Sequence, residues 1–535
     1  STVATIASVL TGSGGLEKAD YGTLILSGAN TYTGGTVISA GTLQIGAGGA
    51  AGEIGGDVAN AGVLAFARSG ELRLDGAISG TGALVQSGPG TVYLTGSNSY
   101  SGGTTIAGGT LRIDGAGALG SGGLTVGTQG TLRASGTFAY GGPITLGGTA
   151  SAPAKSAATA ATFEVDTAQA LTLSGVLSGS AGLTKTGGGL LILTGENSYA
   201  GLTTIAAGTL QIGNGGTIGS ILGDVVNEAS LVFNRSDTYA FTGQISGSGA
   251  VTFTGGGTVL FSSPYTGPIA VDQSTVRLES GSVTASPFTV NAGGVLGGTA
   301  TIGGLTVNGG GTAAPGYSPG TLTVTGAVTF NAGSVYAVDV TPDGAHDLIL
   351  ATGSVTLSSG ASVQVLAVPG RYAAASTMPI LSTSGTLTGT FGSVTSDYAF
   401  LDPALTYDAQ NVYLTLVYNA VDFAAFAQTP NQTAVAVAAQ DLGSGNAVYE
   451  AIFQLPEAAV APAFNQLSGE VYPSIATVIQ QQSIYLREAV GTRLRQSLTG
   501  SGTGALAYAA KAAGPATAPL SAGLTPTLWL QGYGG

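Results

Sequence analysis

His346 is the only histidine of the chain and lies in the segment VTPDGAHDLIL, between Asp343 and Asp347. A serine hydrolase needs a histidine as general base, a carboxylate that orients it and a serine nucleophile. The two aspartates could orient the imidazole, but no G-x-S-x-G turn lies between a strand pattern and a helix pattern to present a serine. We therefore expect a structural or turn role for His346, and we expect Asp347 to cap or turn into the following LIL strand.

Carboxylates for glycosidic cleavage are a second possibility, because two of them facing one substrate can act as acid and base, or as acid and nucleophile. The densest charged cluster consists of Arg68, Glu71, Arg73 and Asp75, with Glu53 and Asp57 nearby. A related segment at 231–251 has Arg235 and Asp237 but no counterparts of Glu71, Arg73 and Asp75. We expect a solvated sheet face with salt bridges, and a catalytic or sugar-binding site is the alternative.

Other kinds of site have less support in the sequence. The chain contains no cysteine, which excludes disulfides, zinc ribbons and thiol nucleophiles. Asp339, Asp343 and Asp347 follow neither the nine-residue calcium repeat nor an EF-hand. No glycine-rich motif opens a helix, so a phosphate site is unsupported. We predict a non-enzymatic protein without catalytic, cofactor-binding or metal-binding residues.

Glycine content and charge restrict the class of protein. The 535 residues include 92 glycines but only 14 basic and 27 acidic residues, and the formal net charge is −13. Low charge together with 43% hydrophobic residues argues against a disordered chain, and glycine without a G-x-y period excludes collagen. No window of 18 apolar residues predicts a transmembrane helix. The lack of a basic cluster argues against nucleic acid as a partner.

Internal repeats decide the architecture. One motif occurs at residues 16–46, 84–115 and 183–213, with a diverged copy at 254–281, and a second motif occurs at 64–84 and 231–251. Three matched pairs share one spacing of 167 positions: Asn30 and Asn197, Phe66 and Phe233, and Ile78 and Ile245. The common spacing indicates duplication of a block of about 100 residues, with 116–182 as a diverged spacer.

Each repeat consists of short alternating runs such as TLILSG, TVISAG and TLQIG, bounded by Gly, Asn or Ser. Alternation with a period of two buries one face of a strand. Two-residue Asn-Gly or Asp-Gly hairpins are scarce, so the stacked turns of a β-solenoid fit better than a sandwich or a barrel. Glycine would then form the corners. We expect inward-facing rungs or left-handed corners at Asn30, Asn98 and Asn197, and stacking between turns at Tyr32, Tyr100 and Tyr199.

The pattern changes toward the C-terminus. Residues 305–417 keep alternating strands, and after Tyr418 the period becomes helical. Thr429 and Pro430 predict the N-cap and first residue of a helix that closes at Gly443. NAVYEAIFQL and PEAAVAPAFNQLSG predict short helices, and residues 469–498 predict a longer helix with three arginines near its end, Arg487, Arg493 and Arg495.

The last residues have a different composition. Residues 499–523 are a Gly/Ala/Ser/Pro linker. The end, LTPTLWLQGYGG, is an alternating run flanked by Trp529 and Tyr533, which is typical of the first strand of a membrane β-barrel. One strand does not close a barrel, so we predict a truncated barrel strand.

These segments together resemble the classical monomeric (type V) autotransporters of Gram-negative bacteria. GTLILSGANTYTGGTVISAGTLQIG is similar to the passenger-associated transport repeat. APGYSPGTLTV with PALTYDAQNVYLTL resembles the pertactin-like stabilising segment at the C-terminus of a passenger. AQTPNQTAVAVAAQDL with FNQLSGEVYPS resembles the helical junction, and LWLQGYGG resembles the first strand of the translocator barrel.

The resemblance implies four domains in an all-β fold with a helical junction. These are a right-handed parallel β-helix (solenoid) of passenger repeats over 1–304, an autochaperone-like stabilising β-helix segment over 305–418, a helical junction over 419–498, and a linker with one barrel strand over 499–535. In this family the helix at 469–498 would plug the barrel lumen or lie against the solenoid.

The resemblance also implies partners and a location. The partners are the protein's own outer-membrane barrel, which the sequence does not contain, and the outer-membrane assembly machinery. The location is the cell surface or outer membrane, reached through the periplasm, or the medium if the passenger is cleaved. The first residues, STVATIASVLTGSGG, lack a basic n-region, so we expect a processed chain or a fragment with the signal peptide removed.

We predict that the chain acts in adhesion, self-association or biofilm formation, with a second copy or a host or matrix ligand as its partner. One alternative is a passenger with polysaccharide-cleaving or esterase activity, which a groove collecting carboxylates from successive turns would favour. Another alternative is a stalk whose functional head lies N-terminal to Ser1.

Overall fold

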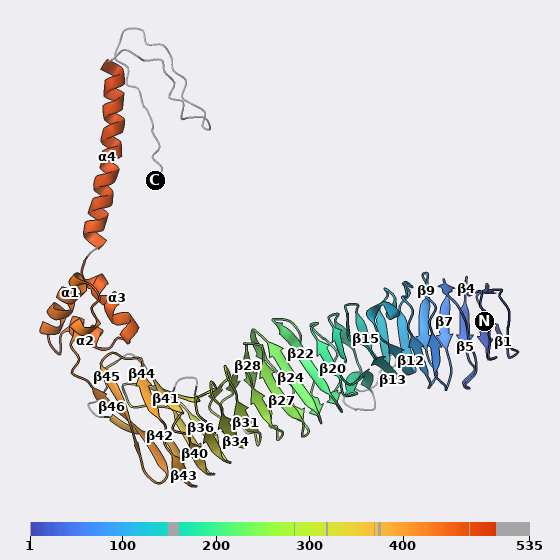
Figure 1. Ribbon diagram of the computed structural model, residues 1–535, viewed down its shortest axis with the longest axis horizontal. Coiled ribbons are helices and arrows are strands. Elements are labelled where there is room, and N and C mark those ends of the chain that lie inside the picture. Colours follow the sequence, from blue (N-terminus) through green and yellow to red (C-terminus); the bar gives the residue numbers. More distant parts are fainter. Residues whose placement is uncertain are drawn as a thin grey trace. The chain divides into compact units, whose positions relative to one another are not determined.

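The computed structural model describes residues 2–147, 160–282, 284–316, 319–368, 370–372, 376–469 and 471–498. It divides into two compact units. The first comprises residues up to 397 together with 401–419, and it is a parallel β-solenoid (Figure 1). The second comprises residues 398–400 and the chain from Ala420 onward, and its described elements are helices. The predicted solenoid with C-terminal helices is therefore confirmed.

Within the described residues, five sheets run along the stacked turns of the solenoid. The largest contains, in order of pairing, β1 (Val3–Ile6), β3 (Thr23–Leu26), β5 (Thr42–Ile45), β7 (Val63–Phe66), β10 (Ala83–Gln86), β12 (Thr104–Ile113), β13 (Leu124–Ala134), β16 (Ala160–Val165), β19 (Gly182–Thr186), β21 (Thr203–Ile205), β23 (Val225–Asn227) and β26 (Ile245–Ser246). Four further strands pair beside this path: β8 (Leu72–Leu74), β11 (Thr91–Leu94), β15 (Ile144–Leu146) and β18 (Leu177–Gly179).

A second long sheet contains β14 (Phe138–Tyr140), β17 (Ala170–Leu173), β20 (Leu190–Leu193), β22 (Thr209–Gly216), β24 (Ser230–Arg235), β27 (Ala250–Thr254), β29 (Ile269–Val271), β31 (Pro287–Val290), β34 (Gly304–Val307), β37 (Val328–Phe330), β40 (Val355–Leu357) and β43 (Leu387–Gly389). A short sheet at the N-terminal end contains β2 (Leu16–Lys18), β4 (Thr36–Ile38), β6 (Val58–Asn60) and β9 (Ile78–Ser79).

Two sheets cover the C-terminal half of the solenoid. One contains β25 (Thr238–Ala240), β28 (Thr258–Phe261), β30 (Thr275–Leu278), β32 (Val295–Gly298), β35 (Thr312–Pro315), β38 (Val335–Val340), β41 (Ser362–Ala367) and β44 (Ser393–Ser396). The other contains β33 (Thr301–Ile302), β36 (Thr321–Val324), β39 (Leu348–Ala351), β42 (Ser376–Thr383), β46 (Asn411–Tyr418) and β45 (Leu401–Tyr407). A short 3-10 helix, η1 (Ala116–Leu119), lies between β12 and β13.

The turns stack with their inward positions in register. Leu43 pairs with Leu64, and Leu64 pairs with Leu84, so each turn takes about 20 residues. All three leucines are fully buried. Because side chains alternate between the two faces of a strand, every added turn covers the apolar row of the turn before it. Each buried leucine contributes roughly 1.5–3 kcal/mol, so the stack stabilises itself turn by turn.

Glycine is sterically required at particular corners. Gly208 has φ +70, and a Cβ there would lie 2.4 Å from the carbonyl oxygens of Gly187 and Gly189. Gly41 occupies the equivalent corner of the first repeat with the same φ, and its Cβ would meet the backbone of the preceding turn at 2.5 Å. The left-handed conformation and the close backbone approach both exclude a side chain. The high glycine content therefore has a geometric cause at these corners.

The C-terminal end of the solenoid closes with antiparallel strands. β42 pairs antiparallel with β46, and β46 pairs antiparallel with β45, whereas the other paired strands of the described solenoid run parallel. Tyr336 lies beneath these strands, fully buried, and donates a hydrogen bond to the carbonyl oxygen of Ile380 at 2.5 Å. The hairpin formed by β45 and β46 thus covers the edge of β42, which would otherwise be open to another strand.

The helical unit begins with a 3-10 turn, η3 (Phe423–Phe426), and continues with α1 (Pro430–Asp441), α2 (Ala447–Phe453), α3 (Glu457–Leu467) and α4 (Val471–Leu498). Thr429 caps α1 in a capping box with Gln432, and Pro430 is its first residue, as predicted. Phe400, Phe423 and Phe464 form the centre of a small aromatic core in this unit. Phe400 is contributed by the segment 398–400, which belongs to this unit.

The long helix predicted at 469–498 is confirmed as α4. No helix among the described residues combines the length and the apolarity needed to cross a membrane. The predicted linker at 499–523 and the barrel strand with Trp529 and Tyr533 lie outside the described residues.

Candidate functional site

The histidine and its two neighbouring aspartates do not form a catalytic triad. The two ring nitrogens of His346 lie 2.9 Å from the carbonyl oxygen of Gly344 and 3.1 Å from that of Pro379. Asp343 accepts a hydrogen bond from the hydroxyl of Thr341 in the same turn. Both nitrogens therefore face backbone acceptors, where a general base would face a serine hydroxyl. The turn role predicted for His346 agrees with this geometry.

Asp347 is buried and joins two strands of the C-terminal half. Its Oδ1 accepts a hydrogen bond from the amide of Gly320 at 2.8 Å, and its Oδ2 accepts one from the amide of Asp339 at 2.9 Å. Its exposed fraction is 1%. Burial, together with a smaller effect of the neighbouring Asp339 carboxylate, raises the pKa of Asp347 to about 7. The residue anchors the start of β39, as predicted.

A shallow cavity of about 180 Å³ lies beside Asp347 on the sheet that contains β30 and β38. Its lining includes Gly297 and Ala314 together with the charged residues Arg277 and Asp339. Burial also raises the pKa of Asp339. Two carboxyls with raised pKa values are a feature of acid catalysts, but both oxygens of Asp347 already accept backbone hydrogen bonds.

The charged cluster around Arg68 is divided between the interior and the surface. Arg68 is 4% exposed, and its guanidinium donates to the carbonyl oxygens of Gly52 and Glu71. The prediction that it belongs to a solvated face is therefore wrong. The sequence offered a signal for this, because Arg68 follows the buried Leu64 and Phe66 in the inward phase of the alternation. Burial lowers the pKa of Arg68.

Arg235 repeats the arrangement of Arg68 in the second copy. It donates to the carbonyl oxygens of Gly219 and Thr217. A glutamate lies 4.0 Å from each arginine, Glu53 in the first copy and Glu196 in the second. The second copy adds Asp237, whose carboxylate lies 2.7 Å from Nη2 of Arg235 and whose pKa is lowered by that hydrogen bond. Both copies use the arginine to hold a glycine-rich loop.

Arg73 and Asp75 are the surface part of the cluster. Their side chains are 55% and 68% exposed and form an ion pair with 2.7 Å between Nε and Oδ1. Thr95 on the next turn donates a hydrogen bond to Asp75, and this bond, followed by Arg73, lowers the pKa of Asp75. The prediction of a salt-bridged sheet face is thus correct for Arg73 and Asp75.

An inward-facing polar residue in each transport repeat holds the carbonyl groups of a corner, a role that the sequence pattern did not predict. Lys185 donates from Nζ to the carbonyl oxygens of Thr186 and Gly187 at 2.6 Å and of Ala207 at 3.1 Å. Its side chain is fully buried, and burial lowers its pKa to about 8. Gln86 takes this position in the second repeat and donates to Gly88 and Gly90.

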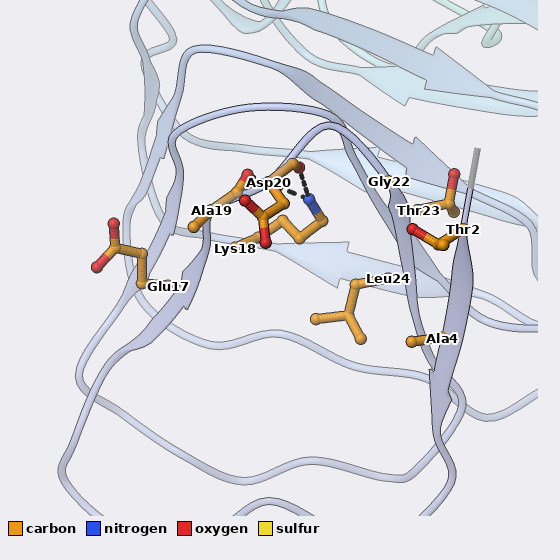
Figure 2. Close-up of a pocket in the computed structure, with 9 residues that line it drawn as sticks. All are labelled: Thr2, Ala4, Glu17, Lys18, Ala19, Asp20, Gly22, Thr23 and Leu24. Carbon is orange, nitrogen blue, oxygen red and sulfur yellow. Dashed lines mark hydrogen bonds between the residues drawn. The ribbon is translucent and has the colours of Figure 1, made fainter.

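Lys18 takes the same position in the first repeat. Figure 2 shows its ammonium group turned toward the corner that follows it, where it donates to the carbonyl oxygens of Ala19 and Asp20. A third bond reaches Ala40 on the next turn at 3.1 Å. A cavity of about 250 Å³ adjoins this corner. The side chain could serve as a nucleophile only by leaving these acceptors, so a structural role follows.

The repeated asparagines bridge neighbouring turns. Asn197 accepts a hydrogen bond from the amide of Leu177 on the preceding turn and donates one to the carbonyl oxygen of Ser220 on the next, both at 2.9 Å. Asn30 and Asn98 make the equivalent pairs of bonds. The alternative of left-handed corners is wrong, because none of the three has a positive φ. The asparagines are rungs that bind backbone.

The repeated tyrosines were expected to stack, and this expectation is wrong. Each hydroxyl instead forms a hydrogen bond with the threonine four residues later, at 2.8 Å for Tyr32, 2.5 Å for Tyr100 and 2.7 Å for Tyr199. None of these rings belongs to a stacked aromatic pair among the described residues. A buried tyrosine needs a partner for its hydroxyl, and the repeat supplies one locally.

A ladder of amides, also absent from the sequence-based predictions, connects four turns of the C-terminal half. Asn331 donates from Nδ2 to Oδ1 of Asn308 at 2.8 Å, Asn308 donates to Asn291 at 2.7 Å, and Asn291 donates to the carboxylate of Asp272 at 2.6 Å. The sequence carried a signal in TVNAG, TVNGG and TFNAG. No three His, Asp or Glu side chains gather as metal ligands within the described ranges.

Parts of this chain are similar to known proteins. The family model of the passenger-associated transport repeat matches residues 16–45, 84–113 and 183–212. The chain is 34% identical over 250 residues to the adhesin BmaC autotransporter of Brucella suis biovar 1 (strain 1330), which covers 47% of this chain and 5% of the adhesin. It is 28% and 27% identical over 332 residues to two extracellular serine proteases of Serratia marcescens, which covers 52% of this chain and 32% of each protease.

The repeated polar residues of this parallel β-solenoid bind its own backbone. The fold is therefore that of a scaffold protein, whose outer surfaces are available for contacts with other molecules. The chain is an autotransporter passenger with passenger-associated transport repeats and homology to the adhesin BmaC autotransporter. It spans only a small part of the adhesin and about a third of the proteases it matches. Membership in this class implies a translocator barrel and export to the outer membrane or cell surface.

Proposed function

We propose that the chain acts as a non-enzymatic passenger in adhesion and self-association on the surface of a Gram-negative cell. The observation that carries the proposal is the use of its recurrent polar side chains: Lys185, Asn197 and Arg235 all bind backbone groups of neighbouring turns. These side chains are therefore used within the stack, and the polar groups left for a partner lie on the outer faces of the turns. The matched relative named as an adhesin supports the proposal.

The enzymatic alternative has less support. A general acid in a glycosidase needs a carboxyl whose pKa is raised, and Thr95 and Arg73 lower the pKa of Asp75. The serine proteases among the relatives are matched over 32% of their length. A screen of polysaccharides and acyl esters, with Glu71→Gln and Asp75→Asn as controls, tests this alternative, and hydrolysis that these substitutions abolish would establish it.

Adhesion is tested by display. The chain is joined to an outer-membrane translocator barrel and expressed in a non-aggregating Gram-negative host, with the barrel alone as the matched control. We expect the displaying cells to settle together or to bind extracellular matrix proteins, and the control cells to stay dispersed. Dispersed cells without matrix binding, at confirmed surface density, would overturn the proposal.

A second candidate is a stalk that supports a functional domain elsewhere in a longer protein. The observation that favours it is that related segments occur in proteins named for different activities, an adhesin and a protease. Intact-mass analysis of the native surface protein tests this candidate. A mass equal to that of residues 1–535 together with a translocator barrel would count against it.

A further inference from the structure

One outer face of the solenoid carries two parallel rows of charged and polar side chains. The cation row, on neighbouring strands from β8 to β16, consists of Arg73, Tyr93, Arg112, Arg133 and Glu164, which pair in register. Two positions further along the chain, directly after the end of each strand, lies the acid row: Asp75, Thr95, Asp114, Ser135 and Asp166. Both rows follow the stacking direction and point outward, because the residues between them are buried.

Contacts within the chain fix the geometry of this face. Arg73 lies 2.7 Å from Asp75, and Arg133 lies 2.9 Å from Asp166. Arg112 donates from Nε to the hydroxyl of Ser135 at 3.1 Å. An exposed ion pair alone is worth roughly 0–1 kcal/mol, but a row of cross-linked side chains loses less conformational entropy when it binds a partner.

Arg112 and Asp114 are the exception to internal pairing. The guanidinium of Arg112 lies 4.3 Å from the centre of the Tyr93 ring, and Asp114 accepts a hydrogen bond from the Tyr93 hydroxyl at 3.1 Å. In the described part of the chain neither residue forms an ion pair. The same tyrosine holds both charges in place.

The same contacts exclude two other ligands. Sugar rings bind aromatic faces, but Tyr93 lies between the guanidinium groups of Arg73 and Arg112, at 5.0 Å and 4.3 Å from its ring centre. Neither face of the ring is therefore open. An anionic polymer would meet four carboxylates among three arginines. The complementary partner must itself carry alternating rows of both charges.

A second copy of this face meets that requirement in one orientation. A two-fold axis parallel to the solenoid axis, between the two rows, places each cation row opposite the other copy's acid row. Arg112 then meets Asp114 of the second copy, and Arg73 meets Asp75, twice each by symmetry. At the far end of the rows Glu164 meets Asp166, so the attractive pairs lie at the strands β8 and β12. A perpendicular axis at the level of β12 instead places Asp114 opposite Asp114 and Arg112 opposite Arg112, which is repulsive at the centre of the face, although Arg73 then meets Glu164.

We propose that passengers associate side by side in the same direction through this face, with reciprocal Arg112–Asp114 ion pairs at its centre. The inference rests on the proposed self-association and specifies its surface and orientation. Five strands at about 4.8 Å spacing give the charged patch a length of about 20 Å, so it buries less than the roughly 800 Å² per partner of a stable dimer. A single contact is weak, and many passengers on one surface multiply it.

Charge reversal tests the pairing. The purified chain is compared with Arg112→Glu, Asp114→Arg, their 1:1 mixture and the double variant by sedimentation at about 20 mM and 150 mM salt. Arg277→Glu on β30 and Glu279→Arg directly after it, two exposed positions away from this face, are the matched controls for net charge. We expect each single reversal at the face to raise the dissociation constant at least tenfold, and the mixture to associate. We expect the controls to match the wild-type chain.

Orientation is tested separately with single cysteines, since the chain has none. Donor and acceptor dyes on Ser359→Cys, many turns from the face, give energy transfer only in a parallel pair. If Arg112→Glu and Asp114→Arg both associate like the wild-type chain, or if the labelled dimer shows no energy transfer, the proposed face is overturned. Self-association itself would still stand. A wild-type chain that neither sediments as a dimer nor aggregates displaying cells overturns both the inference and the proposed self-association.

Discussion

Arg68 and Arg235 lie 167 positions apart in the sequence, and each donates from Nη1 to the carbonyl oxygen of the glycine sixteen residues before it. The acceptors are Gly52 and Gly219. The duplication has thus retained a buried contact together with the loop that the contact holds. Each arginine therefore stabilises a turn, and its guanidinium donors bind backbone carbonyl groups of the chain itself.

Removal of Arg68 is expected to open its loop locally. Arg68→Ala leaves the carbonyl groups of Gly52 and Glu71 without their donor, and unsatisfied buried polar groups cost about 1–3 kcal/mol each. We expect the opening free energy of residues 46–57 to fall by about 2–4 kcal/mol, measured by native-state hydrogen exchange. Residues 213–223 around the intact Arg235 provide an internal control. Equal protection of the two loops would contradict this role.

Lys185 can be tested with a residue that already occupies its position in another repeat. Gln86 takes the position in the second repeat and also donates to two corner carbonyls. Lys185→Gln should therefore cost less than about 1 kcal/mol, because the amide replaces most of the lost bonds. Lys185→Met keeps the length but leaves the carbonyl oxygens of Thr186, Gly187 and Ala207 unsatisfied, and should cost about 2–4 kcal/mol.

The measurement for Lys185 is hydrogen exchange across residues 182–209, with the first repeat as reference. Equal destabilisation by glutamine and methionine would indicate that the ammonium charge matters more than the hydrogen bonds. That result would contradict the interpretation of the position as a corner donor.

The raised pKa of Asp347 should make local stability depend on pH. Its pKa is about 7 in the folded chain and about 4 in an unfolded one, because burial disfavours the charged carboxylate. As the pH falls below 7 the folded state takes up the proton first, so stability rises between about pH 7 and pH 4. As the pH falls through this window, we expect the opening constant for the backbone amides of Gly320 and Asp339 to fall about tenfold for each pH unit.

The control for this effect is Asp347→Asn, which cannot titrate. Protection factors corrected for intrinsic exchange should then be independent of pH in this segment, although the substitution loses one acceptor. A slope that persists in the asparagine variant would assign the titration to Asp339 instead, whose pKa burial also raises.

The solenoid was predictable, while the inward polar residues were missed for a specific reason. Leu64 and Phe66 occupy the inward positions of an alternating strand and are fully buried, and the shared 167-residue spacing established the stacking. Arg68 falls in the same phase as these two residues, but a charged residue was assigned to the surface on its type alone. A charge in the inward phase of a strand pattern indicates a buried donor when glycine corners supply free carbonyl groups.

The amide ladder was missed for a different reason. Its members are separated by turns of unequal length, with 17 positions between Asn291 and Asn308 and 23 between Asn308 and Asn331. A search for one fixed period does not find such a series. The paired rows around Tyr93 depend on strand register, which spacing alone did not specify.

Asn308 is the residue at which the ladder can be tested with two matched substitutions. Asn308→Ala removes the donor to Asn291 and the acceptor for Asn331. The two lost side-chain hydrogen bonds are partly solvated, so the substitution should lower the free energy of unfolding by about 1–2 kcal/mol. Asn308→Asp keeps the acceptor but loses the donor, and it places a second carboxylate one rung from Asn291, which already donates to Asp272. The aspartate should therefore be neutral to mildly destabilising at pH 4 and more destabilising than alanine at pH 8, because only the ionised form repels the oxygen of Asn291. Thermal unfolding of the two variants at both pH values, followed by circular dichroism, measures this difference. If alanine and aspartate lower the midpoint equally at pH 8, the amides lie side by side without contributing to the stacking of these turns.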